Sequence, residues 1–310
     1  MSDTLGTPSQ KLRTELARGP IFAAGCYDAL SARLVQEAGF PVGYISGLAV
    51  EATQLGSADV GLITRTEMAA HAARMATAVD IPLVCDVDTG YGDVVNVAKT
   101  IRELHRAGIA GIQIEDQVDP KRCPLLGPPE VLETETAVRR VAACVESKPD
   151  PNFFVIARTD AYQISLSAVI ERSNRYLDAG ADATMSPLKA VDGRPMASLT
   201  PDEQMEWLEH YVSSVHGPVV GMQVPAGRTV DDMMEIGFKM VVLPTVTLYS
   251  AATAMMAALR SCREQRGVAS HLKTHPYDPA VTGIGLLNLL GAEEVTELTR
   301  CYGPIEEASG

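Results

Sequence analysis

Positive charges are scarce in this sequence. Its 310 residues contain 26 lysines and arginines against 39 aspartates and glutamates, which gives a formal net charge of −13 at pH 7. Binding to nucleic acid needs a basic surface, so the deficit argues against DNA or RNA as a partner. The acidic balance is expected to keep the protein dispersed in water.

Paired cysteines and long apolar runs are also lacking. The six cysteines are scattered, without a CxxC pair or a metal-ligand spacing, which is typical of reduced thiols in the cytoplasm. The first twenty residues have no apolar core of a signal sequence, and no run is long enough to cross a membrane. The sequence therefore predicts a cytoplasmic protein without a membrane partner.

A repeated helix-to-strand pattern is present instead. Gly39, Gly108, Gly180 and Gly237 each end a helical stretch and precede a strand-like run, as expected for glycines in the left-handed conformation. Four more strand-like runs cover residues 21–25, 82–86, 153–157 and 218–222. Eight strands alternating with helices predict one α/β domain over residues 1–310, a (β/α)8 barrel with a C-terminal helical extension from about residue 266 to 310. A doubly wound open sheet is the alternative, but no GxGxxG follows the first strand.

Carboxylates close two neighbouring predicted strands. Asp86 and Asp88 follow one buried run, and Glu115 and Asp116 follow the next. Unpaired carboxylates are costly at such positions unless a cation compensates them, and Mg2+ prefers oxygen ligands. Alternatively, Asp86 or Asp88 caps a helix that begins near Asp93. The number of acidic residues favours a metal site.

Other polar residues follow the remaining predicted strands, where a barrel places its active site. The candidates for substrate binding are Tyr27, Ser46, Gly47, Leu48, Arg158, Ser186 and Gln223. Arg158 could bind a substrate carboxylate bidentately or pair with one of the acidic residues, and both roles remain open. No histidine follows a predicted strand, which leaves a Ser-His hydrolase or a His-ligated zinc enzyme with little support.

The long loop over residues 116–129 is rich in proline and glycine and contains Lys121, Arg122 and Cys123. Such a loop suits a lid that closes over an anionic substrate. Cys123 is a candidate acid or base, with its thiolate favoured by the two neighbouring cations. The alternative is an inert loop cysteine.

Five segments in this order resemble the isocitrate lyase and phosphoenolpyruvate mutase superfamily. They are YDALSARLVQEAGF, YISGLA, CDVDTGYG, IEDQVDPKRC and IARTDA. The similarity runs from about Ile21 to Leu259 and is nearest to the short branch, which includes 2-methylisocitrate lyase, 2,3-dimethylmalate lyase and the carboxyphosphonoenolpyruvate mutases. The resemblance implies a barrel that binds Mg2+ and an enolate-forming 2-oxo acid. It also implies a homotetramer, a dimer of dimers in which C-terminal helices swap between subunits.

The same resemblance implies roles for individual residues. The Mg2+ ligands would be Asp86, Asp88 and Glu115, with Asp59 nearby, and Mn2+ suits the same oxygens. Ser46, Gly47 and Leu48 would bind the 2-oxo acid, together with Tyr27. The catalytic residues would be Cys123, Arg158 and Lys121.

The sequence departs from the lyase motifs at three positions. The lyase loop reads Lys-Arg-Cys-Gly-His, whereas Pro124 and Leu125 follow Cys123 here. The glutamate that ends strand six in lyases corresponds to Ser186 or Pro187, and Gln223 replaces the asparagine of strand seven. The Lys-Thr-Asn-Ser segment of mutases is absent. In the lyases, the three altered positions recognise the second, carboxylate-bearing half of the substrate or assist its proton transfer, so the resemblance implies that the second half differs here.

The first hypothesis is a Mg2+-dependent carbon-carbon lyase that forms an enolate from a 2-hydroxy or 2-oxo carboxylate, with Cys123 as the acid. Leu125, Leu126 and Met185 suggest that the second half of the substrate is less polar than a dicarboxylate. An oxaloacetate-type decarboxylase or an acylpyruvate hydrolase shares the enolate step. A barrel that binds without catalysis is the hypothesis from another class, and it gives no reason to retain clustered carboxylates.

Overall fold

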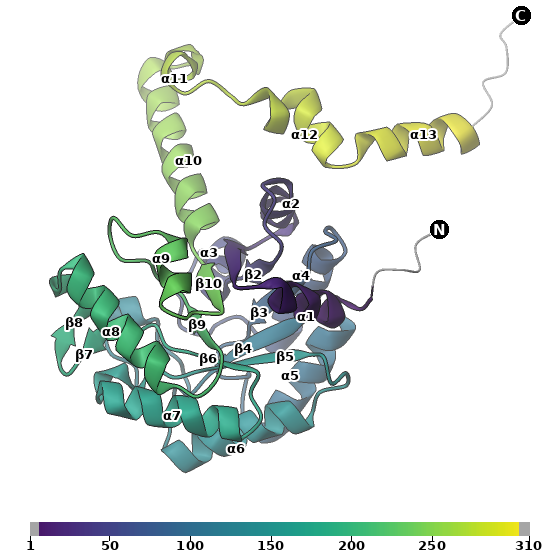
Figure 1. Ribbon diagram of the computed structural model, residues 1–310. Coiled ribbons are helices and arrows are strands. Elements are labelled where there is room, and N and C mark those ends of the chain that lie inside the picture. Colours follow the sequence, from purple (N-terminus) through teal and green to yellow (C-terminus); the bar gives the residue numbers. More distant parts are fainter. Residues whose placement is uncertain (1–5, 304–310) are drawn as a thin grey trace, which may run out of the picture. The chain divides into compact units, whose positions relative to one another are not determined.

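Eight parallel strands close into a barrel in the computed structural model, which describes residues 6–303 (Figure 1). The barrel strands are β1 (Ile21–Cys26), β2 (Gly43–Ile45), β3 (Leu83–Asp86), β4 (Gly111–Glu115), β5 (Phe154–Arg158), β6 (Ala183–Met185), β9 (Val219–Gly221) and β10 (Met240–Leu243). They follow one another around the barrel in chain order, and β10 pairs with β1 to close it. The predicted (β/α)8 barrel and its strands are confirmed.

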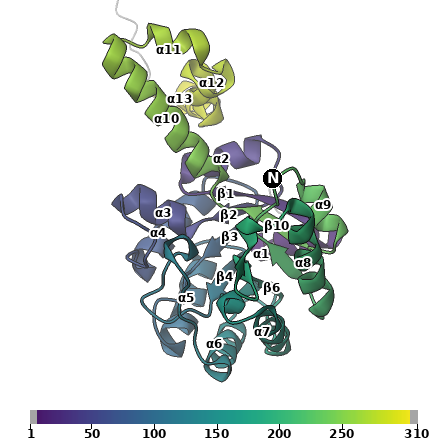
Figure 2. The ribbon, with the colours of Figure 1, turned by 90° about the vertical axis from the view of Figure 1, so that its left-hand side faces the viewer.

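Helices surround this barrel on the outside (Figure 2). They are α2 (Ala29–Glu37), α3 (Gly47–Leu55), α4 (Arg65–Ala76), α5 (Val94–Arg106), α6 (Thr134–Glu146), α7 (Leu166–Asp178), α8 (Pro201–Ser214) and α9 (Val230–Glu235). Helix α10 (Val246–Gln265) follows β10 in the chain. A hairpin of β7 (Ala190–Val191) and β8 (Arg194–Pro195) follows β6 and was not predicted. Two-residue strands carry too little periodicity to be seen in a sequence.

The glycines that end the helices adopt the predicted left-handed conformation, with φ of +85° at Gly39, +84° at Gly108, +96° at Gly180 and +111° at Gly237. At the end of α2, Gly39 N–H donates to Gln36 O and Phe40 N–H donates to Val35 O. This pair of hydrogen bonds is the Schellman arrangement, which turns the chain sharply out of the helix. The same pattern recurs at the other three glycines.

Apolar side chains fill the barrel interior. Ile21, Val84, Ile156 and Val242 form one buried cluster there, and Leu12 of α1 (Pro8–Arg18) belongs to the same cluster. Helix α1 therefore packs at the N-terminal end of the strands. The opposite end of the barrel, where the strands finish, is left to the polar residues described below.

The chain divides into two compact units, of which one ends at Tyr249 and the other begins at Ser250, inside α10. The second unit contains α11 (Ala269–Thr274), α12 (Gly283–Leu289) and α13 (Ala292–Tyr302). A helical extension was expected from about residue 266, and its last residues, 304–310, lie outside the described part of the chain. Within residues 6–303, no helix is long and apolar enough to cross a membrane.

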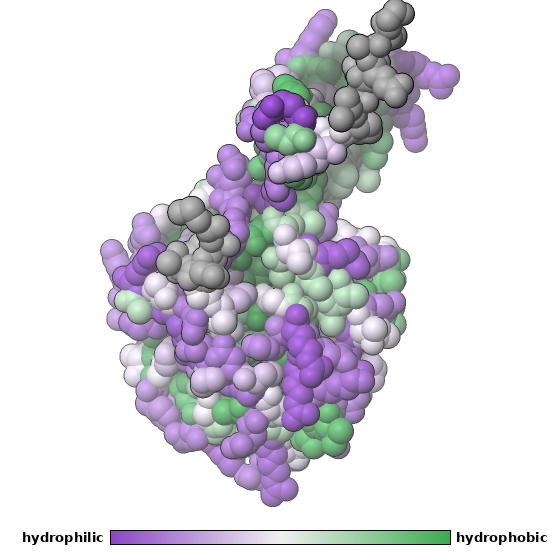
Figure 3. Space-filling view, turned by 90° about the vertical axis from the view of Figure 1, so that its right-hand side faces the viewer, coloured by the Kyte–Doolittle hydropathy of each residue, from purple (hydrophilic) through white to green (hydrophobic). Residues whose placement is uncertain are grey.

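Hydrophilic side chains cover much of the barrel unit on the face seen in Figure 3, with smaller apolar areas between them. This is the surface expected from the excess of acidic residues.

Replacing Gly39 with alanine should destabilise the barrel unit by about 1–2 kcal/mol, because a Cβ disfavours the left-handed backbone. No atom lies within 4 Å of the position that this Cβ would take, so the effect would come from the backbone alone. Gly39→Asn should cost less, since asparagine tolerates this conformation. Urea unfolding of both variants measures the difference, and equal losses would contradict the conformational explanation.

Candidate active site

Strand pairing brings Glu115 and Arg158 together at the C-terminal end of the barrel. The two residues are direct neighbours in the register between β4 and β5. Arg158 Nη1 lies 3.0 Å from Glu115 Oε2, and Arg158 Nη2 donates to Asp160 Oδ2 at 2.9 Å. Arg158 therefore forms the ion pairs that were one of its two predicted roles, and its side chain also lines a cavity.

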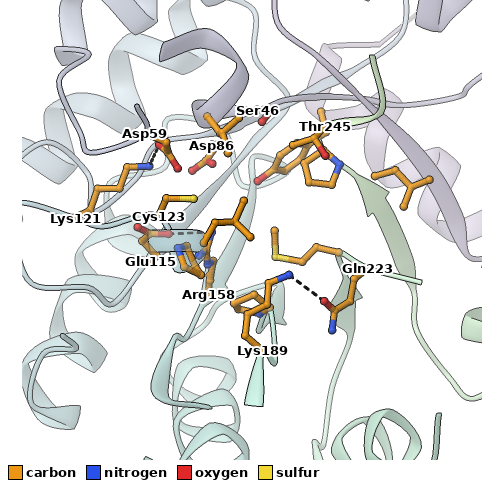
Figure 4. Close-up of a pocket in the computed structure, with 18 of the residues that line it drawn as sticks. Ser46, Asp59, Asp86, Glu115, Lys121, Cys123, Arg158, Lys189, Gln223 and Thr245 are labelled. Carbon is orange, nitrogen blue, oxygen red and sulfur yellow. Dashed lines mark hydrogen bonds and ion pairs between the residues drawn. The ribbon is translucent and has the colours of Figure 1, made fainter. Parts of the chain in front are cut away.

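Lys121 reaches from the loop after β4 into the acidic residues that follow β3. Its Nζ forms an ion pair with Asp59 and lies 2.8 Å from Asp88 Oδ1. The second contact is an ion pair by distance but lacks hydrogen-bond geometry, so Asp88 Oδ1 has no hydrogen-bond partner. Figure 4 shows Lys121 directed at Asp59, with Asp86 beside them.

Negative charges outnumber positive charges in this group of buried side chains. The carboxylate cluster, as it is called below, comprises Asp59, Asp86, Asp88, Glu115 and Asp160 together with the cations Lys121 and Arg158. Burial and the neighbouring Asp88 raise the pKa of Asp86 from 3.8 to about 6. Burial also raises the pKa of Glu115, against the effect of Arg158. The two cations of the cluster are therefore too few to balance its five carboxylates.

Two oxygens of the cluster have no hydrogen-bond partner although they are buried. They are Asp88 Oδ1 and Glu115 Oε1. Asp88 Oδ1 has the Lys121 ammonium beside it, whereas Glu115 Oε1 has neither a hydrogen bond nor an ion pair among the described residues. Leaving a buried polar atom unpaired is costly, and a cation with its water shell would satisfy it. An all-oxygen donor set of this kind fits Mg2+.

Direct coordination by several side chains is not what the geometry offers. Within residues 6–303, no group of three or more His, Cys, Asp or Glu side chains is arranged to hold one ion directly. Mg2+ usually takes one or two carboxylates and keeps several waters. The residues thus fit an ion held largely through water, rather than a closed cage.

Two of the acidic residues singled out in the sequence have structural roles. Asp93 is the N-cap of α5, which begins at Val94, so neither Asp86 nor Asp88 caps that helix. Asp116 is buried, and its carboxylate accepts hydrogen bonds from Tyr176, Thr159 and Arg172. The alternative in which Asp86 or Asp88 serves as a cap is therefore wrong.

The N-terminus of α3 faces the carboxylate cluster. Ser46 is its N-cap, and Gly47 N–H lies 3.4 Å from Asp86 Oδ2. A Cβ at Gly47 would come within 3.0 Å of that oxygen, so the close approach suits glycine. Ser46 and Leu48 line the cavity, and the positive end of a helix dipole favours an anion.

Cys123 is buried beside Asp59 and lines the cavity. Burial, together with Asp59, raises the pKa of its thiol. Lys121 lowers the pKa of the thiol, as predicted, but burial and Asp59 outweigh this effect, so the thiolate is not favoured. A protonated thiol suits a general acid.

The cavity at the barrel mouth has a volume of about 390 Å³. The predicted residues that line it are Ser46, Leu48, Asp59, Asp86, Glu115, Lys121, Cys123, Arg158 and Gln223. Asp88 lies behind Lys121, in a second hollow. Neither Tyr27 nor Ser186 lines the cavity: Tyr27 binds His71 through its carbonyl oxygen, and Ser186 Oγ accepts from Leu188 N–H.

The residues used to infer an apolar second half of the substrate do not support that inference. Met185 is fully buried and Leu126 is exposed, and neither lines the cavity, whereas Leu125 does. The sequence did not show whether these side chains point into the cavity. The position of Met185 in β6 and the course of the loop around Leu125 and Leu126 decide that.

Sequence reasoning missed Gln117 and Lys189. Gln117 links Asp160 to the loop. Its Nε2 donates to Asp160 Oδ2, and its Oε1 accepts from Arg122 N–H. Lys189 lines the cavity and binds Gln223. A lysine three residues after a predicted strand resembles a surface lysine, so no sequence signal marked it.

Comparison with known proteins adds to this geometry. The sequence model of the family described as phosphoenolpyruvate phosphomutase matches residues 12–263. The chain belongs to this family. That assignment confirms the resemblance to the isocitrate lyase and phosphoenolpyruvate mutase superfamily, whose members are named lyases and mutases.

Two curated relatives of this mutase-family chain are lyases. The probable 2-methylisocitrate lyase 1 of Corynebacterium glutamicum is 38% identical over 77% of this chain and 76% of its own length. The 2,3-dimethylmalate lyase of Eubacterium barkeri is 32% identical over 91% of this chain and 93% of its own length.

Two solved structures share the fold closely. Phosphoenolpyruvate phosphomutase from Streptomyces platensis subsp. rosaceus has a TM-score of 0.85 and 28% identity, covering 96% of this chain and 99% of that one. Oxaloacetate acetylhydrolase in complex with 3,3-difluorooxalacetate has a TM-score of 0.83 and 28% identity, covering 97% and 99%.

Asp116→Asn should destabilise the protein by about 3–5 kcal/mol, because it removes the charge from a buried ion pair with Arg172. Urea unfolding measures the loss. The exposed Asp231→Asn is the control and should stay within about 0.5 kcal/mol. A small effect at Asp116 would contradict its structural role.

Asp86→Asn should have the opposite effect when divalent cations are removed with EDTA. A carboxyl pKa raised from 3.8 to about 6 means that Asp86 contributes stability below pH 3.8 and that this contribution is lost as the pH rises through about 6. The asparagine variant avoids that loss, so it should exceed the wild type at pH 7.5 by up to ~3 kcal/mol and by less at pH 5. Urea unfolding at both pH values tests this, and a pH-independent difference would refute it.

Proposed function

We propose that this protein is a Mg2+-dependent carbon-carbon lyase that acts on a 2-hydroxy or 2-oxo carboxylate through an enolate. The observation that carries the proposal is the carboxylate cluster at the barrel mouth, in which five carboxylates face two cations and the buried Glu115 Oε1 has no hydrogen-bond partner. A buried thiol, Cys123, lines the same cavity and supplies a proton donor. The lyase names of relatives at 32% and 38% identity support the reaction class.

The metal would be held by Asp86, Asp88 and Glu115, with Asp59 completing the oxygen set. Mn2+ fits the same hard ligands. The ion would supply a Lewis acid that polarises the 2-oxo or 2-hydroxy oxygen of the substrate. These residues contribute the negative charge that attracts the ion.

The protein's own side chains bind the substrate and move the proton. Ser46 and Leu48, at the start of α3, bind the carboxylate of the enolate-forming half. Arg158 stabilises the negative charge that develops on cleavage. Cys123 holds a proton on Sγ and gives it to the enolate carbon, and in the condensing direction it takes that proton back. Lys121 anchors the loop through Asp59 and Asp88.

Oxaloacetate chemistry is the second candidate. A solved structure at 28% identity is an oxaloacetate acetylhydrolase, and it covers nearly the whole chain. An oxaloacetate-type decarboxylase or acylpyruvate hydrolase would use the same enolate-binding half. Loss of carbon dioxide needs no acid on the loop, so Cys123 separates the alternatives. A non-catalytic barrel has no use for a buried cluster with excess negative charge.

We also propose a homotetramer, a dimer of dimers, located in the cytoplasm. The second unit presents exposed apolar side chains, among them Ile284 and Leu287 of α12 and Leu298 of α13, which a partner subunit would cover. Light scattering at several protein concentrations measures the state directly, and a monomer would refute the proposal.

Proton NMR in D2O tests the reaction class. The wild type, given 2-oxo acids, 2-hydroxy diacids and their alkyl-substituted relatives, should show Mg2+-dependent cleavage or deuterium exchange beside the keto group. Asp88→Asn should lower the rate at least about 100-fold, because a site with one carboxylate fewer binds Mg2+ more weakly and the substrate oxygen is then polarised less. Asp231→Asn is the surface control. Equal rates with and without Mg2+ would overturn the proposed metal dependence.

Cys123→Ser separates lyase chemistry from decarboxylation. A serine hydroxyl is a weaker acid than a thiol, so cleavage should fall by about 100-fold or more if Cys123 is the general acid. The rate is measured by coupled detection of the 2-oxo acid product. Full activity in the variant would favour the oxaloacetate-type decarboxylase.

A further inference from the structure

Lys189 occupies a position that the surrounding backbone fixes. The preceding residue, Leu188, is fully buried and has a left-handed φ of +40°, and its N–H donates to Ser186 Oγ at 3.3 Å. On the other side, Lys189 O accepts from Met196 N–H at 2.9 Å. A leucine in this conformation is strained, and such strain is found mostly at functional sites.

The β7–β8 hairpin begins directly after Lys189. Val191 pairs with Arg194, and the two residues between them, Asp192 and Gly193, have φ of +47° and +78°. Two successive positive values are typical of a type I′ turn, which holds its strands tightly. The lysine therefore extends from a constrained backbone and not from a loose loop.

The side chain of Lys189 has one partner. Its Nζ donates to Gln223 Oε1 at 3.2 Å, and Gln223 Nε2 donates to Leu188 O at 3.5 Å. An ammonium group has three donors, so donors remain for a ligand. Among the ion pairs formed by residues 6–303, none includes Lys189.

Arg158, the neighbouring cation of the cavity wall, is already neutralised by Glu115 and Asp160. Lys189 has no such counter-ion. Burial and the positive charge of Arg158 lower the pKa of Lys189, so its charged form lacks compensation. An anion bound beside Nζ would supply that compensation.

The cavity has two chemically different ends. Figure 4 shows Asp59 and Asp86 at one end, and Lys189 and Gln223 across from them at the other. Pro187, Met222 and Leu243 contribute apolar wall to the same cavity. A substrate whose enolate-forming half lies at the carboxylate cluster extends its second half toward Lys189.

We propose that Lys189, held in place by Gln223, selects a substrate whose second half ends in a carboxylate. The inference rests on the proposed function, because the cluster must bind the first half. It makes the substrate a diacid with an anion at each end and an apolar middle that the cavity wall can contact. Lys189 is the specificity-determining residue, and Gln223 is its positioning residue.

Lys189→Met tests this, because methionine keeps most of the apolar stem and removes the charge. Diacids are compared with their matched half-amides, in which the second carboxylate is neutral, by proton NMR in the presence of Mg2+. The kcat/KM ratio of diacid over half-amide should fall at least about tenfold in the variant, mainly through KM. Lys189→Arg should restore most of the ratio, and Gln223→Leu should lower it about threefold.

Lys99→Met is the matched control, since Lys99 is exposed on α5 and the substitution removes the same charge. It should leave the ratio unchanged. An equal loss for diacid and half-amide in Lys189→Met would show a structural role and overturn the inference, as would an unchanged ratio.

Failure of the proposed function has a different signature. In that case the wild type would turn over none of the acids. Binding is then measured by calorimetry instead of rates, for the diacid and the half-amide, with the wild type and with Lys189→Met. A tenfold weaker binding of the diacid alone would keep the role of Lys189 as an anion anchor. If Lys189→Met bound the diacid as tightly as the wild type does, the role of Lys189 as an anion anchor would be refuted.

Discussion

The excess of buried negative charge at the barrel mouth is the constraint on which the rest of the site depends. Five carboxylates meet two cations there, and burial, together with the neighbouring Asp88, raises the pKa of Asp86 to about 6. Carboxylates cannot be buried in this way for stability alone, because each loses its hydration. The barrel can hold them only because its strands and outer helices supply stability elsewhere, through an apolar interior and a second apolar layer.

The excess of carboxylates also separates the roles of three cations that line the cavity. Lys121 and Arg158 are both engaged with carboxylates, so neither is free to read a distant anion. Lys189, across the cavity, has among residues 6–303 an uncharged hydrogen-bond partner, Gln223, and no ion pair. The cavity therefore combines an end with an excess of carboxylates and an end with a lysine, and a molecule that spans both is expected to be polar at its two ends.

Much of this arrangement could be predicted from the sequence. The four glycines that end helices, and the buried runs after them, specified eight strands because backbone conformation and burial leave local traces in residue type. Asp86, Glu115 and Arg158 were also predictable, since a residue at a strand end in a barrel has a known place. Two inferences did not hold: burial and Asp59 outweigh the effect of Lys121 on the Cys123 thiol, and Met185 and Leu126 do not line the cavity and so give no support to a less polar second half of the substrate. Burial and partner choice decide both, and neither is written in the local pattern.

The sequence by itself determined the family, the barrel and the polar residues at the strand ends, because those depend on periodicity and on residues fixed at strand ends. Only the tertiary structure decided which charges meet. It showed that Asp116 pairs with Arg172 away from the cavity, that Lys121 crosses to Asp59, and that Lys189 reaches Gln223 over 34 positions of the chain. Pairings between distant residues depend on the register of strands and on the course of loops. The sequence lists the charges but does not state the distances between them, and electrostatic interactions depend on distance.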